Sequence, residues 1–395
     1  MKSINISISE EHLLGIVNSL PNLTQYLEGP SVEEGPLGAA LFYCYYAKYT
    51  DDSKYFELAE TFLDKATSLI SPESYNKKYR TDSYDRLLAS YGMFFDFATK
   101  NSFLDINLNE YLNPIDEILI NLMETKLRVG DLDCWSGALS TGRYLYSRLD
   151  SHEHLKNNLS NLVNEIENWS FCDKQGDIYW KSPTLKNNVY FGISHGSSMV
   201  ISFLVALYEK GIQQQKCKDL VSKAVRFILK HQRQEQKGLF PITLNDTIEP
   251  KQFSQCYGDL GVYYGLYRAS SILNDISLTH QLESILQSCL NRTFEDGLTW
   301  DASMVYGASG VAAVYSKLFR LSNNPIFDAA QNYWYMQIPK YYKRNTEFLG
   351  FDTMVKDSPK SMNVSYGWGG IGVGISLMKY IRRDLPHLDA FTMLI

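Results

Sequence analysis

A short turn of small residues followed by an apolar helix recurs along the chain and constrains its fold more than any other feature. Seven copies begin near residues 35, 89, 137, 196, 258, 307 and 367 of the 395-residue sequence. The clearest copies read GPLGAALFYCYYAKY from Gly35, YGDLGVYYGLYRASSIL from Tyr257 and YGASGVAAVYSKLFRL from Tyr306. Second stretches between the turns have apolar residues at three- and four-residue steps, which is typical of amphipathic helices. The sequence therefore predicts a series of helix pairs.

Helix pairs of this kind stack on one another because one pair cannot bury its own apolar face. The alternation typical of strands is nearly absent. We predict one all-α domain over residues 1–395, an α/α toroid of seven helical hairpins; an open superhelix is the alternative. Closure is favoured because the helices that follow the turns are apolar nearly all round, as the inner of two layers requires. In a closed ring the turns converge at one mouth.

Bulk charge and hydropathy exclude several classes of protein. The net charge of −6 and a pI near 5.7 argue against a nucleic-acid partner, which usually requires a basic face. No apolar stretch near the N-terminus has the length of a signal-peptide core. The longest apolar run, at residues 199–208, is about half of what a membrane-spanning helix needs. We expect a cytoplasmic protein that does not span a membrane.

Cysteine usage supports the same location. The six cysteines are scattered without paired spacing, so a disulfide framework is not expected. Five of them are expected to pack as small apolar residues. Cys256 differs because it lies directly before a turn.

Three turns carry residues with distinctive chemistry. Asp133 precedes Gly137 by four positions, His195 directly precedes Gly196, and Cys256 and Tyr257 precede Gly258. At one mouth, His195 could act as a general acid or base, and Asp133 could orient it or share its proton. Cys256 could be a zinc ligand or a nucleophile. Taken singly, an aspartate or a histidine at such a position is more often a helix cap, and a cysteine is more often part of the core. Their common placement in the repeat favours a site.

The chain resembles the lanthionine synthetase C-like family, the lanthipeptide cyclases, over nearly its full length. The resemblance rests on Asp-x-x-Ser-Gly from Asp133, His-Gly from His195 and Cys-Tyr-Gly-x-x-Gly from Cys256, in the family's order. It implies addition of a peptide cysteine thiol to dehydroalanine or dehydrobutyrine, which gives a thioether ring. It also implies that Asp133, His195 and Tyr257 handle protons.

The resemblance further implies a zinc ion that activates the substrate thiol, held by two cysteines and a histidine. Cys256 matches the first ligand, but Val305 and Tyr306 stand where the family has the other two. Gln252 and Gln255 replace an arginine and a tryptophan that the family has near that cysteine. A catalytic zinc needs three protein ligands and an open position. We therefore predict no bound cofactor and a degenerate zinc site.

The leading hypothesis is a cyclase-like enzyme that forms thioether rings in a ribosomal precursor peptide without zinc. Trp135, Trp300 and Tyr306 are predicted to bind substrate at the mouth, although packing between hairpins would also explain aromatic residues there. A dehydratase and a transporter are possible partners. The alternatives are a non-catalytic scaffold that holds the peptide, and a carbohydrate-active enzyme that uses Asp133, Asp259 and Asp301.

Overall fold

The computed structural model of the protein describes residues 2–72, 83–233, 238–246, 252–344 and 346–395. Within these residues the chain forms fifteen α-helices and one two-stranded β-hairpin. The predicted all-α fold class is therefore confirmed. None of the helices in the described ranges is both long and apolar enough to cross a lipid bilayer.

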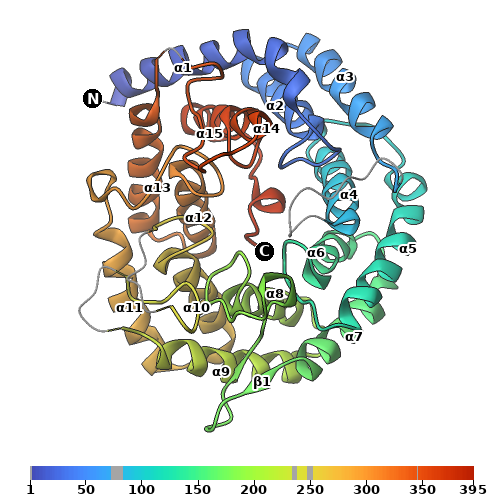
Figure 1. The fold of residues 1–395 in the computed structure, drawn as a ribbon, viewed down its shortest axis with the longest axis vertical. Helices are drawn as coiled ribbons and strands as arrows, with labels where there is room; N and C mark the ends of the chain where they lie inside the picture. Colours follow the sequence, from blue (N-terminus) through green and yellow to red (C-terminus); the bar gives the residue numbers. More distant parts are fainter. Residues whose placement is uncertain (1, 73–82, 234–237, 247–251, 345) are drawn as a thin grey trace. The chain divides into compact units, whose positions relative to one another are not determined.

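The helices alternate between two kinds (Figure 1). Those of the first kind are α2 (Pro36–Thr50), α4 (Tyr84–Lys100), α6 (Ala138–Arg148), α8 (Ser197–Glu209), α10 (Asp259–Leu273), α12 (Ala308–Ser322) and α15 (Gly370–Ile381). Six of them begin within three residues after a predicted turn, but the turn predicted near residue 89 was misplaced, because that residue lies inside α4. Those of the second kind are α1 (Lys2–Leu23), α3 (Lys54–Ser68), α5 (Leu108–Leu127), α7 (Leu155–Asn168), α9 (Gln214–Lys230), α11 (Ile276–Leu290) and α13 (Pro325–Gln337). Seven helices of each kind agree with the seven hairpins predicted from the repeat.

The remaining elements are short. They are the helix α14 (Lys360–Val364), the strands β1 (Phe171–Cys172) and β2 (Ile178–Tyr179), and the 3-10 turns η1 (Thr24–Tyr26), η2 (Pro183–Leu185), η3 (Phe294–Asp296), η4 (Ile338–Tyr341) and η5 (Asp389–Phe391). The strands pair antiparallel, with Phe171 opposite Tyr179 and Cys172 opposite Ile178. They precede the fourth turn, where the repeat predicted no strand.

The two kinds of helix differ in burial, as a double layer requires. In α8 every residue from Ser197 to Leu207 is buried, and in α15 every residue from Gly370 to Tyr380 is buried. By contrast, α9 buries one stripe of residues, among them Leu220, Val221 and Ile228, and exposes the opposite face. An apolar stripe on one face is typical of a helix that covers a core from outside.

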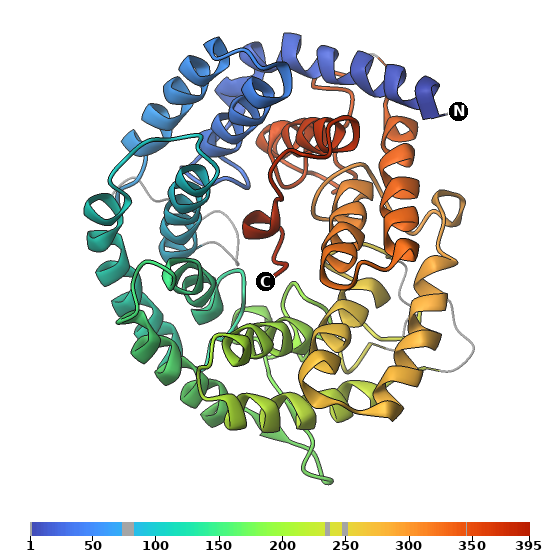
Figure 2. The ribbon, with the colours of Figure 1, turned by 180° about the vertical axis from the view of Figure 1, so that it is seen from behind.

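The described residues group into two compact units, and the prediction of one domain stays a prediction. The first unit takes its residues from 1–76, 90–106 and 297–392, and the second takes its residues from 77–89, 107–296 and 393–395. In the first unit α15 packs against both α1 and α2, as the views in Figures 1 and 2 show. The first and last turn-initiated helices are therefore neighbours.

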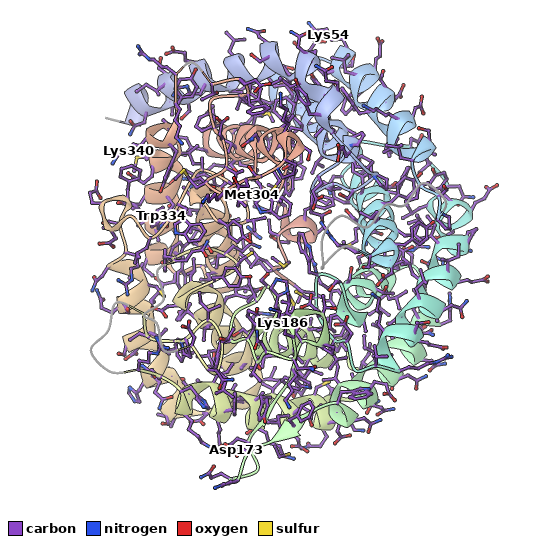
Figure 3. All side chains as sticks on the ribbon, viewed as in Figure 1. Lys54, Asp173, Lys186, Met304, Trp334 and Lys340 are labelled. Atoms are coloured by element: carbon purple, nitrogen blue, oxygen red, sulfur yellow. The ribbon has the colours of Figure 1, made fainter. Side chains whose placement is uncertain are left out.

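In the second unit α8 packs against α9 and α10, and α6 packs against α5 and α7. The β-hairpin lies beside α9, and Asp173 projects from its tip (Figure 3). Lys230 Nζ of α9 lies 2.6 Å from a carboxylate oxygen of both Asp173 and Asp177, so ion pairs fasten the hairpin to the helix.

Substitution of two glycines by alanine tests the packing of α15 in the first unit. A Cβ atom added to Gly374 would lie 2.5 Å from Phe42 Cε2 of α2, whereas one added to Gly15 of α1 would meet nothing within 4 Å. We expect Gly374→Ala to lower the free energy of unfolding in urea by about 1–3 kcal/mol through overpacking. Gly15→Ala should raise it by about 0.5–1 kcal/mol, because alanine favours a helix interior. Equal effects of the two substitutions would contradict this packing.

Candidate active site

One hydrogen bond recurs in five of the turns. A side-chain oxygen four residues before the N-cap glycine accepts the backbone N–H of the residue directly before that glycine. The acceptors are Ser31 (3.2 Å from Glu34 N), Asp133 (3.1 Å from Ser136 N), Ser254 (3.0 Å from Tyr257 N), Ser303 (3.2 Å from Tyr306 N) and Ser365 (3.2 Å from Trp368 N). A serine makes this bond in four of the five turns, and Asp133 makes it in the third turn.

The second oxygen of Asp133 is therefore not needed for the turn, and it contacts His195. Asp133 Oδ1 accepts the backbone N–H groups of Trp135 at 2.8 Å and Ser136 at 3.1 Å. Asp133 Oδ2 lies 2.8 Å from His195 Nδ1. The side chain of Asp133 is fully buried, and that of His195 is 10% exposed. The structure thus brings together two of the predicted catalytic residues.

The electrostatics of this pair fix its protonation pattern. Burial acts to raise the pKa of Asp133, but the charge and hydrogen bond of His195, together with the two backbone donors, outweigh it and lower the pKa. Asp133 is therefore a carboxylate at neutral pH and can only accept a hydrogen bond. The shared proton then lies on His195 Nδ1, which leaves Nε2 able to accept a proton.

Aromatic rings and a small apolar pocket surround the imidazole. The ring of Tyr257 lies 6.4 Å from that of His195 between centroids, and the ring of Tyr190 lies 5.6 Å away in an edge-on arrangement. The pocket beside His195 is lined by Asp133, Leu132, Cys134, Leu139, Trp180, Lys181, Ser182, Gly196, Met199 and Val200. Tyr257, the third predicted catalytic residue, is thus near His195. Its role stays a prediction.

Trp135 lies in the same turn as Asp133 but packs against a cation. The guanidinium carbon of Arg86 lies 4.1 Å from the centroid of the Trp135 ring, which is a cation–π contact. Arg86 is buried, and Trp135 is half-buried. One face of the indole is therefore covered by Arg86. Substrate binding by Trp135 stays a prediction.

Cys256 is in the second unit with Asp133 and His195, and its thiol is deeply buried. Burial raises the pKa of Cys256 to about 12, although a hydrogen bond with Ser194 opposes the shift. Cys256 is therefore a neutral thiol at physiological pH in the absence of a metal ion, and it is not a ready nucleophile, because that role needs the thiolate.

The other predicted binding residues belong to the first unit. The rings of Trp300 and Tyr306 lie 5.9 Å apart, with Tyr306 half-buried and Trp300 41% exposed. Val305 is buried, and its backbone N–H donates to Gly367 O at 3.0 Å. Trp300 and Tyr306 thus form one aromatic pair, and their contact with substrate stays a prediction.

The donor chemistry of Cys256, Val305 and Tyr306 does not fit a catalytic zinc ion. Val305 has no donor atom in its side chain and Tyr306 offers a phenol, so the Cys256 thiol is the one soft donor of the three. A catalytic zinc site requires three histidine, cysteine or carboxylate ligands. Among the residues that the structure describes, no group of three such side chains is placed to hold a metal ion.

The chain belongs to the lanthionine synthetase C-like protein family, whose model matches residues 27–393. The resemblance noted in the sequence is therefore confirmed. Among solved structures, the fold matches nisin cyclase with a TM-score of 0.74 at 15% sequence identity, over 100% of this chain and 98% of that one. A weaker likeness is to cellobiose 2-epimerase from Bacillus thermoamylovorans, with a TM-score of 0.43 and 10% identity over 95% and 99% of the two chains. No curated protein matches the sequence.

Sequence reasoning missed two residues that contact the Asp133–His195 pair. Ser182 Oγ lies 3.3 Å from Asp133 Oδ2, and Tyr190 packs edge-on against His195. Both lie between two turns, where the repeat gives no register to compare. The local signals of a tight bend there are Pro183 and the two consecutive asparagines that follow Lys186.

The repeated hydrogen bond predicts how the turn responds to substitution of Asp133. Asp133→Ser should keep the turn, because serine makes the same hydrogen bond in four other turns. Asp133→Ala should be less stable than Asp133→Ser by about 1 kcal/mol, because it leaves a backbone N–H without its acceptor. Urea unfolding of both variants measures this difference. Equal stabilities would contradict a capping role for Asp133.

Proposed function

We propose that the protein is a cyclase-like enzyme that forms thioether rings in a peptide, with His195 as the proton-transfer residue and without zinc. The observation that carries the proposal is the 2.8 Å contact between His195 Nδ1 and the buried carboxylate of Asp133. Membership of the lanthionine synthetase C-like family supports a peptide that carries cysteine and dehydrated serine or threonine residues. The nisin cyclase fold is consistent with that substrate.

The mechanism begins with the thiol of the substrate cysteine. His195 Nε2 accepts the thiol proton while Asp133 holds the proton on Nδ1 and stabilises the imidazolium that forms. The thiolate sulfur attacks Cβ of the dehydroalanine or dehydrobutyrine, so a carbon–sulfur bond forms. The electrons of the carbon–carbon double bond move onto the neighbouring carbonyl and give an enolate. Return of the proton from Nε2 to Cα completes the addition, and atoms and charge balance without a co-reactant.

Zinc-free activation of the thiol is chemically feasible. A free cysteine has a pKa near 8.5, so a few per cent is thiolate at neutral pH and a neighbouring base can supply more. The side chains of Val305 and Tyr306, neither of them a usual zinc ligand, support a route that does not pass through a metal ion. In this proposal Cys256 packs within its turn, and Tyr257 contacts the substrate from beside His195.

The partners follow from the same proposal. The substrate is a ribosomal precursor peptide, and a dehydratase must act before this protein because ring closure consumes dehydrated residues. A transporter for the finished peptide is a further possible partner. A non-catalytic role as a peptide-holding scaffold would use the same fold, but it gives the Asp133–His195 contact no task.

The carbohydrate hypothesis has less support because two of its carboxylates have structural tasks. Asp259 accepts the backbone N–H groups of Leu239 and Phe240, both at 3.0 Å. Asp301 accepts the backbone N–H groups of Ser303 at 2.9 Å and Met354 at 3.0 Å. Glycosidases need two carboxylic groups that face the sugar and exchange protons.

Substitution of His195 tests catalysis directly. The probe is a synthetic peptide with one dehydroalanine and one cysteine. Ring closure leaves its mass unchanged, so free thiols are counted by alkylation and mass spectrometry. Wild-type protein should close the ring, and His195→Ala and Asp133→Asn should slow closure by about 100-fold or more, the usual share of a general acid–base group. A scaffold would bind the peptide and leave its thiol free with all three proteins.

The metal content tests the zinc-free route. Purified wild-type protein should contain much less than one zinc ion per chain, and a chelator should leave the rate of ring closure unchanged. The matched variant carries Val305→Cys and Tyr306→His, which adds the two ligand types that the family has. It should bind zinc more tightly than wild type because three ligands are then available. A tightly bound zinc ion in wild type would overturn the zinc-free proposal.

A further inference from the structure

Ser182 reaches the same carboxylate oxygen as His195. We propose that Ser182 is a positioning residue for the Asp133–His195 pair, and that its hydroxyl holds Asp133 Oδ2 in line with the imidazole. Ser182 Oγ lies 3.3 Å from Asp133 Oδ2, and His195 Nδ1 lies 2.8 Å from that oxygen. The inference rests on the proposed function, because only there does His195 move a proton.

The two oxygens of Asp133 are held in different ways. Backbone N–H groups of Trp135 and Ser136 fix Oδ1, and they belong to the turn itself. Oδ2 is held by the side chains of Ser182 and His195. When His195 carries a second proton, the Ser182 hydroxyl is the other side-chain donor that holds Oδ2.

The backbone around Ser182 fixes the position of its hydroxyl. We call residues 181–188 the strap. Ser182 N donates to Asn188 O at 2.9 Å, and Ser182 O accepts the N–H groups of Leu185 at 3.1 Å and Asn187 at 2.9 Å. Two consecutive residues, Lys186 and Asn187, have left-handed backbones with φ of 62° and 57° and turn the strap back on itself. The strap can be located in Figure 3 by the label of Lys186. Three hydrogen bonds therefore hold Ser182 on both sides of its Cα.

Burial makes the Ser182 contact effective. Ser182 is only 2% exposed, and it lines the pocket beside His195 together with apolar residues such as Trp180 and Met199. In such surroundings a hydrogen bond to a carboxylate is stronger than in water, because bulk water does not compete for the hydroxyl.

The strap contains a matched control. Thr184 Oγ1 donates to Asp131 Oδ2 at 2.8 Å, and Asp131 is a separate carboxylate that accepts the Asp133 backbone N–H at 3.2 Å. Burial raises the pKa of Asp131, in contrast to that of Asp133. Thr184→Val removes a hydroxyl that fastens the strap, whereas Ser182→Ala removes the one that touches Asp133 Oδ2.

The first experiment needs no peptide. In protein labelled with ¹⁵N-histidine, the Nδ1 proton of His195 should exchange slowly with water because a buried carboxylate accepts it. Ser182→Ala should speed this exchange by about three- to tenfold, which corresponds to one hydrogen bond. Ser182→Cys keeps a weaker donor of similar size and should fall between the two. Thr184→Val should exchange as wild type does, even if its melting temperature falls.

The second experiment measures ring closure on the dehydroalanine–cysteine peptide. Ser182→Ala should lower kcat by about three- to tenfold with little change in KM, because positioning affects the proton transfer rather than peptide binding. Faster exchange in Ser182→Ala without ring closure by wild type would keep the positioning role and overturn the proposed function. The positioning role is overturned if His195 has no slowly exchanging Nδ1 proton in wild type. It is also overturned if Ser182→Ala matches wild type or Thr184→Val in both measurements.

Discussion

The hydrogen bond that caps five of the seven turns is the interaction on which the rest of the structure depends. It joins a side-chain oxygen four residues before the N-cap glycine to the N–H directly before it, and it recurs from Ser31 to Ser365. The helix that follows is almost wholly buried, but the residue directly before the glycine is half-buried in the turns of Glu34, His195, Tyr257 and Tyr306. Each of these turns thus presents one side chain at a helix N-terminus without disturbing the core. The side chain directly before the glycine can therefore differ from one repeat to the next while the fold of the repeat stays the same.

Asp133 shows how chemistry is added to this scaffold. A carboxylate makes the same turn as a serine hydroxyl, but it has one oxygen to spare. That oxygen meets His195 of the following turn, so two repeats that are separate in sequence share one proton. The lowered pKa of Asp133 follows from this arrangement, because the charge of His195 and two backbone donors together outweigh burial. In the strap, the Ser182 hydroxyl donates to the same oxygen of Asp133. Backbone N–H groups therefore hold one carboxylate oxygen, and the side chains of Ser182 and His195 hold the other.

The sequence predicted those parts of the molecule that repeat. The helix pairs, the buried inner helices and the meeting of Asp133 with His195 all follow from register, since equivalent positions in stacked repeats lie near one another. The sequence could not predict the β-hairpin, the strap or Ser182, because these lie between turns and have no counterpart in the other repeats. The Arg86–Trp135 contact was missed for a related reason: the second turn is the weakest copy and was predicted near residue 89, whereas Arg86 lies in the first turn of α4.

Burial also explains how Cys256 and Val305 fit into their turns. The residue two positions before the N-cap glycine is buried in most turns, as Glu33, Ser194, Cys256 and Val305 show. Cys256 and Val305 are both small, and each fills the same kind of enclosed place in its own turn. A cysteine there needs no metal ion to be retained, since a protonated thiol packs as a small apolar side chain. The turn of Tyr306 likewise keeps its capping hydrogen bond without a ligand pair, because that bond comes from Ser303 and the backbone. The cap of this turn therefore does not depend on which side chains stand at residues 305 and 306.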